Sequence, residues 1–223
     1  MTDPAELDER IAGVRARIAD AARRAGRDPN DVTLVGASKT VPADRLVVAV
    51  RAGLTDLGEN RAQELLAKAP ALDAAGCAPR WHFVGRLQRN KVGALAPHVT
   101  LWHSVDRLTV GQAIARRAPG ARVLVQVDLG DEPQKGGCPP EDAADLVDAL
   151  RGLALDVAGL MTVPPQDADP RPPFATLREL ASRVGVHELS MGMTDDYDVA
   201  VEEGATMVRV GRAIFGPRPA RTA

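Results

Sequence analysis

Lys39 is the residue of this chain whose type and position most clearly suggest chemistry. It ends the apolar run 32–39, which predicts a buried strand closed by a turn at 40–42. The chain has four lysines, and the rest of its 28 lysine and arginine residues are arginines. Arginine keeps its proton in proteins, whereas a partly desolvated lysine can lose it and attack a carbonyl group. Lys39 is therefore a candidate for a covalent bond to an aldehyde or ketone; the alternative is a lysine that only reaches solvent.

Two glycine-containing turns near the C-terminus could bind a phosphate group. Each follows a predicted strand, 187–192 or 207–212, and precedes a predicted helix start. Backbone N–H groups and the helix dipole favour phosphate at such starts, although ordinary strand-to-helix turns have the same composition. The candidate ligands are two hydroxyl groups, glycine backbone and one cation: Ser190, Thr194, Gly192, Gly211 and Arg209.

These groups lie on a pattern of alternating strands and helices. Strict alternation predicts a parallel sheet, and eight units predict a (β/α)8 barrel formed by one domain, 1–223. Residues 1–25 predict an additional amphipathic helix packed on the barrel. An open doubly wound sheet is the alternative, but no Gly-x-Gly-x-x-Gly follows the first strand. The predicted strands are 32–39, 56–60, 81–87, 100–105, 122–129, 155–163, 187–192 and 207–212.

The carboxyl ends of the strands meet at one mouth of such a barrel. Lys39 and the two turns would then face one phosphorylated aldehyde or ketone, and pyridoxal 5′-phosphate (PLP) is a ligand of this kind. Asn60, at the end of the second predicted strand, could form a hydrogen bond with the ring of such a ligand. His82 could be a general base, although a histidine in a buried strand is more often a hydrogen-bonded core residue.

The composition narrows the range of partners. The net charge is −2 with both signs interspersed, which argues against binding nucleic acid or an anionic membrane. No apolar stretch has the length of a membrane span, and no secretory signal is visible. Cys77 and Cys138 match no metal-ligand spacing, so we expect reduced thiols, no metal and a cytoplasmic protein.

The chain resembles the PLP homeostasis protein family, which is related to the N-terminal barrel of alanine racemase. The resemblance implies that PLP is bound covalently at Lys39. It implies that the phosphate is held by Ser190, Thr194, Gly211 and the nearby backbone of Met191 and Gly192, with Arg209 at the phosphate or at the pyridine nitrogen. The matching motifs run in order along most of the chain: 36–40, 58–60, 82–91, 104–106, 159–161, 189–193 and 208–216.

Members of this family are regarded as non-catalytic proteins that buffer PLP and deliver it to apo-enzymes. The chain departs from the family at Thr194, where serine is more usual, and at Asp128, a carboxylate that could alter the field in the barrel. We also expect a monomer. A weaker hypothesis gives Lys91 and Lys135 a role in accepting or releasing PLP at the mouth.

The main alternative is an active amino-acid racemase. Two-base racemisation needs a second acid or base on the opposite face of the cofactor. The chain has a single tyrosine, Tyr197, which is predicted in the first turn of a helix. A Schiff-base aldolase would use the same fold, but a lysine on the first strand does not match the commonest aldolases of that kind. We therefore expect no catalytic residues.

Overall fold

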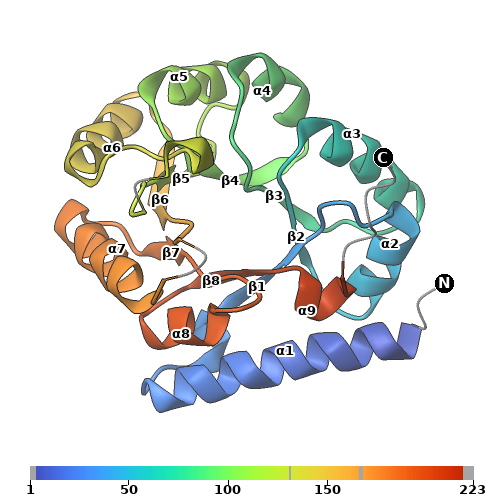
Figure 1. The fold of residues 1–223 in the computed structure, drawn as a ribbon. Helices are drawn as coiled ribbons and strands as arrows, with labels where there is room; N and C mark the ends of the chain where they lie inside the picture. Colours follow the sequence, from blue (N-terminus) through green and yellow to red (C-terminus); the bar gives the residue numbers. More distant parts are fainter. Residues whose placement is uncertain (1–3, 131, 166–167, 218–223) are drawn as a thin grey trace.

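A closed barrel of parallel strands forms the centre of the structure (Figure 1). The computed structural model describes residues 4–130, 132–165 and 168–217. Within these ranges eight strands pair in sequence order, and β8 closes the barrel against β1. The prediction of a (β/α)8 barrel is confirmed, and the open sheet is excluded. The strands are β1 Thr33–Ala37, β2 Asp56–Glu59, β3 Arg80–Phe83, β4 Val99–Val105, β5 Arg122–Gln126, β6 Asp156–Met161, β7 Glu188–Ser190 and β8 Met207–Val210.

Helices surround the barrel, and their apolar faces pack against the outside of the strands (Figure 1). Among the described residues, no helix combines the length and apolar character of a membrane span. The helices are α1 Pro4–Arg24, α2 Ala43–Arg51, α3 Ala62–Ala74, α4 Arg89–Leu95, α5 Leu108–Arg117, α6 Ala143–Gly152, α7 Arg171–Val184, α8 Tyr197–Glu202 and α9 Arg212–Phe215.

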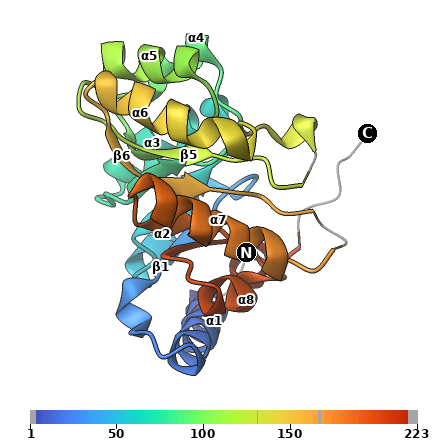
Figure 2. The same cartoon turned by 90° about the vertical axis from the view of Figure 1, so that its left-hand side faces the viewer.

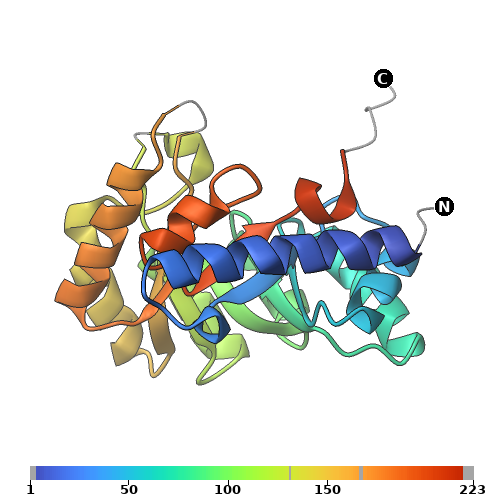
Figure 3. The same ribbon diagram turned by 90° about the horizontal axis from the view of Figure 1, so that it is seen from below.

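The predicted N-terminal helix is present as α1, which lies across the outside of the barrel near β8 and β1 (Figure 3). Its buried residues Leu7, Ile11, Val14 and Ile18 recur at helical spacing and face α8 and α9. Because α9, the helix after β8, has only four residues, the long α1 covers surface that it leaves open.

The barrel interior has an apolar part and a polar part. Leu101, Leu124, Met161 and Met207 form a cluster separate from the main core. His103 and Arg209 come two residues after members of this cluster, so they share its face one step nearer the carboxyl ends of the strands. The polar part therefore lies directly below the mouth where the ligand groups were predicted.

Candidate functional site

A pocket of about 580 Å³ opens at the carboxyl ends of the strands and lies mainly between β1, β2, β7 and β8. This volume falls within the range of small-molecule sites. Five of the eight predicted ligand residues line the pocket: Lys39, Asn60, Thr194, Arg209 and Gly211.

Lys39 lies in a turn rather than in the strand itself. Strand β1 ends at Ala37, two residues earlier than the apolar pattern predicts, and Ser38 is fully buried. Thr40 has a φ of 64°, a left-handed conformation that is unfavourable for a β-branched residue. The Val41 amide donates to the Ser38 carbonyl oxygen at 2.9 Å, so the backbone turns at Lys39 and Thr40 and presents Lys39, half-buried, to the pocket.

A charged cluster of the buried Glu59 and Lys68 and the half-buried Glu64 holds this turn in place. Lys68 Nζ lies 2.5 Å from Glu59 Oε1 and 2.9 Å from Glu64 Oε2, and donates to the Ser38 carbonyl oxygen at 2.8 Å. The Ser38 hydroxyl donates to Glu59 Oε1 at 2.7 Å, and the Thr40 amide donates to Glu64 Oε2 at 2.7 Å. Both neighbours of Lys39 are therefore fixed by one cluster, which stabilises the unfavourable Thr40 conformation.

The two carboxylates of this cluster differ in their electrostatics. Burial raises the pKa of Glu59 above its ordinary value, although Lys68 and Ser38 oppose the change. Burial also acts on Glu64, but the hydrogen bonds from Thr40 and Lys68 outweigh it and lower its pKa. Glu64 is thus the more firmly ionised partner of Lys68.

The two predicted phosphate turns are joined to each other. The Gly211 amide donates to the Thr194 hydroxyl at 3.3 Å, and the Arg209 amide donates to the Gly192 carbonyl oxygen at 3.0 Å. Gly192 has a φ of +89°, and a Cβ there would lie 2.5 Å from the Ala200 Cβ, so only glycine fits. The joined turns therefore form one wall of the pocket, which Thr194 and Gly211 line.

Arg209 contributes a buried positive charge to this wall. Its Nη1 donates to Ser190 Oγ at 2.6 Å and its Nη2 to the Thr162 carbonyl oxygen at 2.8 Å. Burial lowers its pKa to about 10, and the nearby Asp196 carboxylate opposes this change. Arg209 therefore remains a cation at neutral pH.

Asn60 is held at the pocket by the close approach of another strand end. A Cβ at Gly85 would lie 2.1 Å from the Asn60 carbonyl oxygen, so glycine is required there. The buried Asn60 Oδ1 has no hydrogen-bond partner among the described residues. A buried amide oxygen normally has such a partner, which makes Asn60 a candidate contact for a ligand donor.

The other three predicted ligand residues, Ser190, Met191 and Gly192, lie beneath the pocket and do not line it. All three are buried, and the Ser190 hydroxyl bonds to Arg209 and to His103 Nδ1, the latter at 2.8 Å. They support the pocket wall from below.

Other residues singled out by the sequence have structural partners. His82 is a hydrogen-bonded core residue, as the more common interpretation of a buried histidine predicts. Asp128 Oδ1 accepts from the amides of Gly130 and Glu132, at 3.1 and 3.4 Å, within the loop after β5. That loop extends beyond the helices at one end of the barrel (Figure 2). The Asp128 carboxylate thus shapes a loop.

The two lysines proposed for exchange at the mouth do not line the pocket. Lys135 bonds to the Glu132 carboxylate and to the Pro164 carbonyl oxygen, while Lys91 lies in α4.

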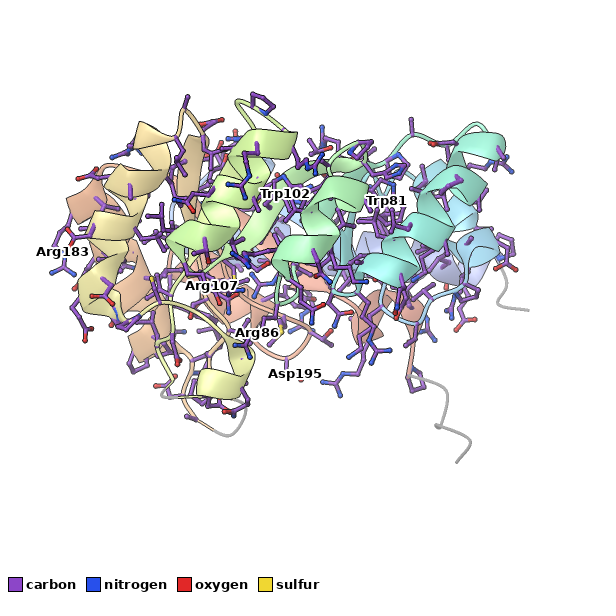
Figure 4. The ribbon with its side chains drawn as sticks, turned by 90° about the horizontal axis from the view of Figure 1, so that it is seen from above. Trp81, Arg86, Trp102, Arg107, Arg183 and Asp195 are labelled. Carbon is purple, nitrogen blue, oxygen red and sulfur yellow. The ribbon has the colours of Figure 1, made fainter. Side chains whose placement is uncertain are left out.

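Figure 4 places Arg86, from the loop after β3, at the same end of the barrel as Asp195, which lines the pocket.

Sequence reasoning missed several residues of the site. Arg45 and Phe215 line the pocket, with the Arg45 guanidinium carbon 5.9 Å from the centre of the Phe215 ring. Lys68 was counted but given no role, although its position four residues after Glu64 in a helix is a visible signal of an ion pair. His103 carried no signal, because its partners come from distant strands.

The fold and the pocket define an alanine racemase-type barrel, and a sequence model of the "Alanine racemase, N-terminal domain" family matches residues 12–219. The chain belongs to this family, and within it to the pyridoxal phosphate homeostasis proteins. The protein of that name from Pseudomonas aeruginosa is 44% identical over 222 residues, covering 95% of this chain and 96% of the relative.

Solved structures agree with this assignment. PipY of Synechococcus elongatus, solved with PLP bound, has a TM-score of 0.83 and 32% identity, covering 94% of this chain and 100% of PipY. A structure described as that of an unknown protein from Bifidobacterium adolescentis has a TM-score of 0.88 and 34% identity, covering 96% of this chain and 98% of that chain.

Proposed function

We propose that this chain binds PLP covalently at Lys39 and acts in PLP homeostasis. When bound, PLP supplies an aldehyde that condenses reversibly with a primary amine and releases one water molecule. One observation carries the proposal. Lys39 lines the same pocket as the Arg209 cation and the joined turns of Thr194 and Gly211. The names of the relatives and the PLP-bound PipY structure support it.

The residues of the pocket suit the groups of this cofactor. We propose that Thr194, Gly211 and nearby backbone amides bind the phosphate and that Arg209 provides positive charge. The unpartnered Oδ1 of Asn60 would accept a hydrogen bond from the ligand. Ser190, Met191 and Gly192 would act from beneath by holding this wall in place.

We further propose that the protein is a carrier rather than an enzyme. The single tyrosine, Tyr197, is buried beneath α1, with the Arg17 guanidinium carbon 4.8 Å from the centre of its ring. Among the described residues that line the pocket there is no tyrosine, histidine or cysteine. Asp195 is the one carboxylate among these lining residues, and it is paired with Arg212. These features support a site without an unpaired second acid or base opposite Lys39.

The carrier would be a monomeric cytoplasmic protein of one domain that meets PLP-dependent apo-enzymes transiently. Two observations support this part of the proposal. Leu108 is the only large hydrophobic side chain exposed in the described ranges, whereas stable dimers usually bury an apolar surface. Both cysteines, Cys77 and Cys138, are unpaired and buried.

The test compares wild-type protein with Lys39→Ala, and Lys91→Ala serves as a control lysine outside the pocket. Wild type and Lys91→Ala should become yellow with PLP, lose the visible band on borohydride reduction and carry the reduced adduct on a Lys39 peptide. Lys39→Ala should do none of these. Colourless wild-type protein after reconstitution would refute PLP binding. Robust racemisation of L-alanine by the yellow protein would refute the carrier role.

A further inference from the structure

A line of buried polar side chains crosses the barrel interior below the pocket. His82 Nε2 lies 3.0 Å from Asp56 Oδ1, and His82 Nδ1 lies 2.8 Å from His103 Nε2. His103 Nδ1 lies 2.8 Å from Ser190 Oγ, which accepts from Arg209 Nη1 at 2.6 Å. All five side chains are buried. Asp56 begins β2 at the far end of the barrel, so the line connects that end to the pocket.

The positions of the protons follow from the donors and acceptors. Arginine can only donate, so Ser190 Oγ accepts from Arg209 and has its own proton left to donate. Burial, reinforced by the charge of Arg209, holds the pKa of His103 well below its usual range, so this ring is neutral.

A proton on His103 Nδ1 would leave the Ser190 hydroxyl proton without an acceptor among the hydrogen bonds of the described residues. Ser190 therefore donates to His103 Nδ1, and His103 Nε2–H donates to His82 Nδ1. His82 Nε2–H then donates to Asp56. These hydrogen bonds run from Arg209 through Ser190, His103 and His82 to Asp56, and we call this line the relay. In each bond the donor is the residue nearer the pocket.

The far end of the relay is a stable anion. Burial opposes ionisation of Asp56, but hydrogen bonds from His82, Arg80 and Thr55 outweigh it and hold its pKa well below the usual range. Arg80 contacts both oxygens of this carboxylate, at 2.7 and 2.6 Å. Asp56 is thus a permanent acceptor for His82.

Arg209 has no carboxylate bonded to it within the described part of the chain. Asp196 acts on it through space, but Asp196 Oδ1 accepts the Met193 amide at 2.5 Å. A carboxylate bonded to Arg209 inside the pocket would compete with any anionic ligand.

We infer that Asp56, His82 and His103 are positioning residues for Arg209, acting through Ser190. The one-way relay fixes the Ser190 hydroxyl as an acceptor for Nη1. The side of Arg209 that faces the pocket then remains available to a ligand. The identity of that ligand rests on the proposed function, whereas the relay itself does not.

The first test uses ligand-free, full-length wild-type protein. Nitrogen-15 NMR of the imidazole rings should find His82 and His103 both in the Nε2–H tautomer, assigned with His82→Gln and His103→Gln. A proton on Nδ1 of either ring would overturn the direction of the relay. This measurement needs no PLP and no altered protein beyond the assignment variants.

The second test compares Asp56→Asn with Asp156→Asn. Asp156 is a matched control, because it also begins a strand and pairs with an arginine of the neighbouring strand, Arg122, at 3.5 Å. Asp56→Asn should shift the Nε resonance of Arg209 in ligand-free protein and weaken PLP binding about two- to tenfold, the contribution of a typical hydrogen bond. Asp156→Asn should change neither.

The two readouts separate the relay from the proposed function. An Arg209 resonance that is the same in Asp56→Asn and Asp156→Asn would overturn the coupling of Asp56 to Arg209. A shifted resonance in a protein that never binds PLP, even as wild type, would uphold the relay and refute the proposed function.

Discussion

The position of Lys39 depends on residues that do not line the pocket. Lys39 lies between Ser38 and Thr40, and both are bonded to the charged cluster of Glu59, Glu64 and Lys68. A buried charged cluster contributes little net stability, because the cost of removing its charges from water offsets their attraction. Removing one partner is nevertheless destabilising, because it leaves an uncompensated buried charge. The cluster therefore fixes the geometry of the turn.

Replacing Lys68 tests this dependence. Lys68→Met should reduce the free energy of unfolding by about 3–5 kcal/mol, because Glu59 loses its buried partner. It should also slow the appearance of the visible PLP band, because the Lys39 turn is no longer held. Chemical denaturation and stopped-flow absorbance measure the two effects.

The double variant Glu59→Gln/Lys68→Met should recover part of the lost stability, since no buried charge is then left unpaired. Lys91→Met is the control for loss of a lysine as such. A Lys68→Met protein as stable as Lys91→Met would contradict the role of the cluster.

At the scale of elements, the helices differ in how tightly they contact their neighbours. An added Cβ at Gly13 in α1 meets nothing within 4 Å, whereas one at Gly111 in α5 would lie 2.0 Å from Leu150 Cδ2. The same residue type therefore marks a solvent-facing position in one helix and a close helix contact in the other.

Gly13→Ala and Gly111→Ala should have opposite effects. Gly13→Ala should raise the free energy of unfolding by about 0.5–1 kcal/mol through helix propensity. Gly111→Ala should lower it by about 1–3 kcal/mol through overpacking. Thermal and denaturant unfolding of both variants would check this, and changes of the same sign would refute it.

Most element types were predictable from sequence, but several boundaries were not. The apolar pattern predicted a strand up to Lys39, yet β1 ends at Ala37 because Thr40 must reach Glu64. Helix α3 continues through Pro70 to Ala74, although proline is a common signal for the end of a helix. Proline removes one hydrogen bond, but packing of Leu72 in the core keeps the helix intact.

For the whole molecule, the Asp56 carboxylate makes stability depend on acid pH. Its pKa is lower in the folded chain than the value of about 3.9 for an unfolded aspartate. Its contribution is therefore complete above about pH 4 and is lost as the pH falls through the folded pKa.

Asp56→Asn should destabilise the protein by about 1–3 kcal/mol at pH 7, because it weakens the bonds to Arg80 and His82. The difference from wild type should shrink as the pH falls below about 4. Denaturant unfolding at a series of pH values checks this, and a constant difference down to pH 2 would contradict the assignment.

The surface predicts the oligomeric state. With Leu108 as the exposed large hydrophobic residue of the described ranges, light scattering after gel filtration should give the mass of one chain. A concentration-independent dimer would refute the proposed monomer.

The sequence by itself determined the barrel, the end of the barrel that carries the site, and the residues Lys39, Asn60, Thr194, Arg209 and Gly211 on its pocket. Local periodicity and strand-to-helix spacing encode these features, because a parallel barrel brings all carboxyl ends of its strands together.

Only the tertiary structure decided which hydrogen-bond partners hold those residues in place. It paired Ser190 with His103, 87 positions away, and Lys68 with the Ser38 carbonyl oxygen, 30 positions away. Such partners depend on barrel register and on which face each strand turns inward, and a one-residue shift would reverse every side chain. The sequence thus identified residues at the pocket surface, and packing determined how they are held.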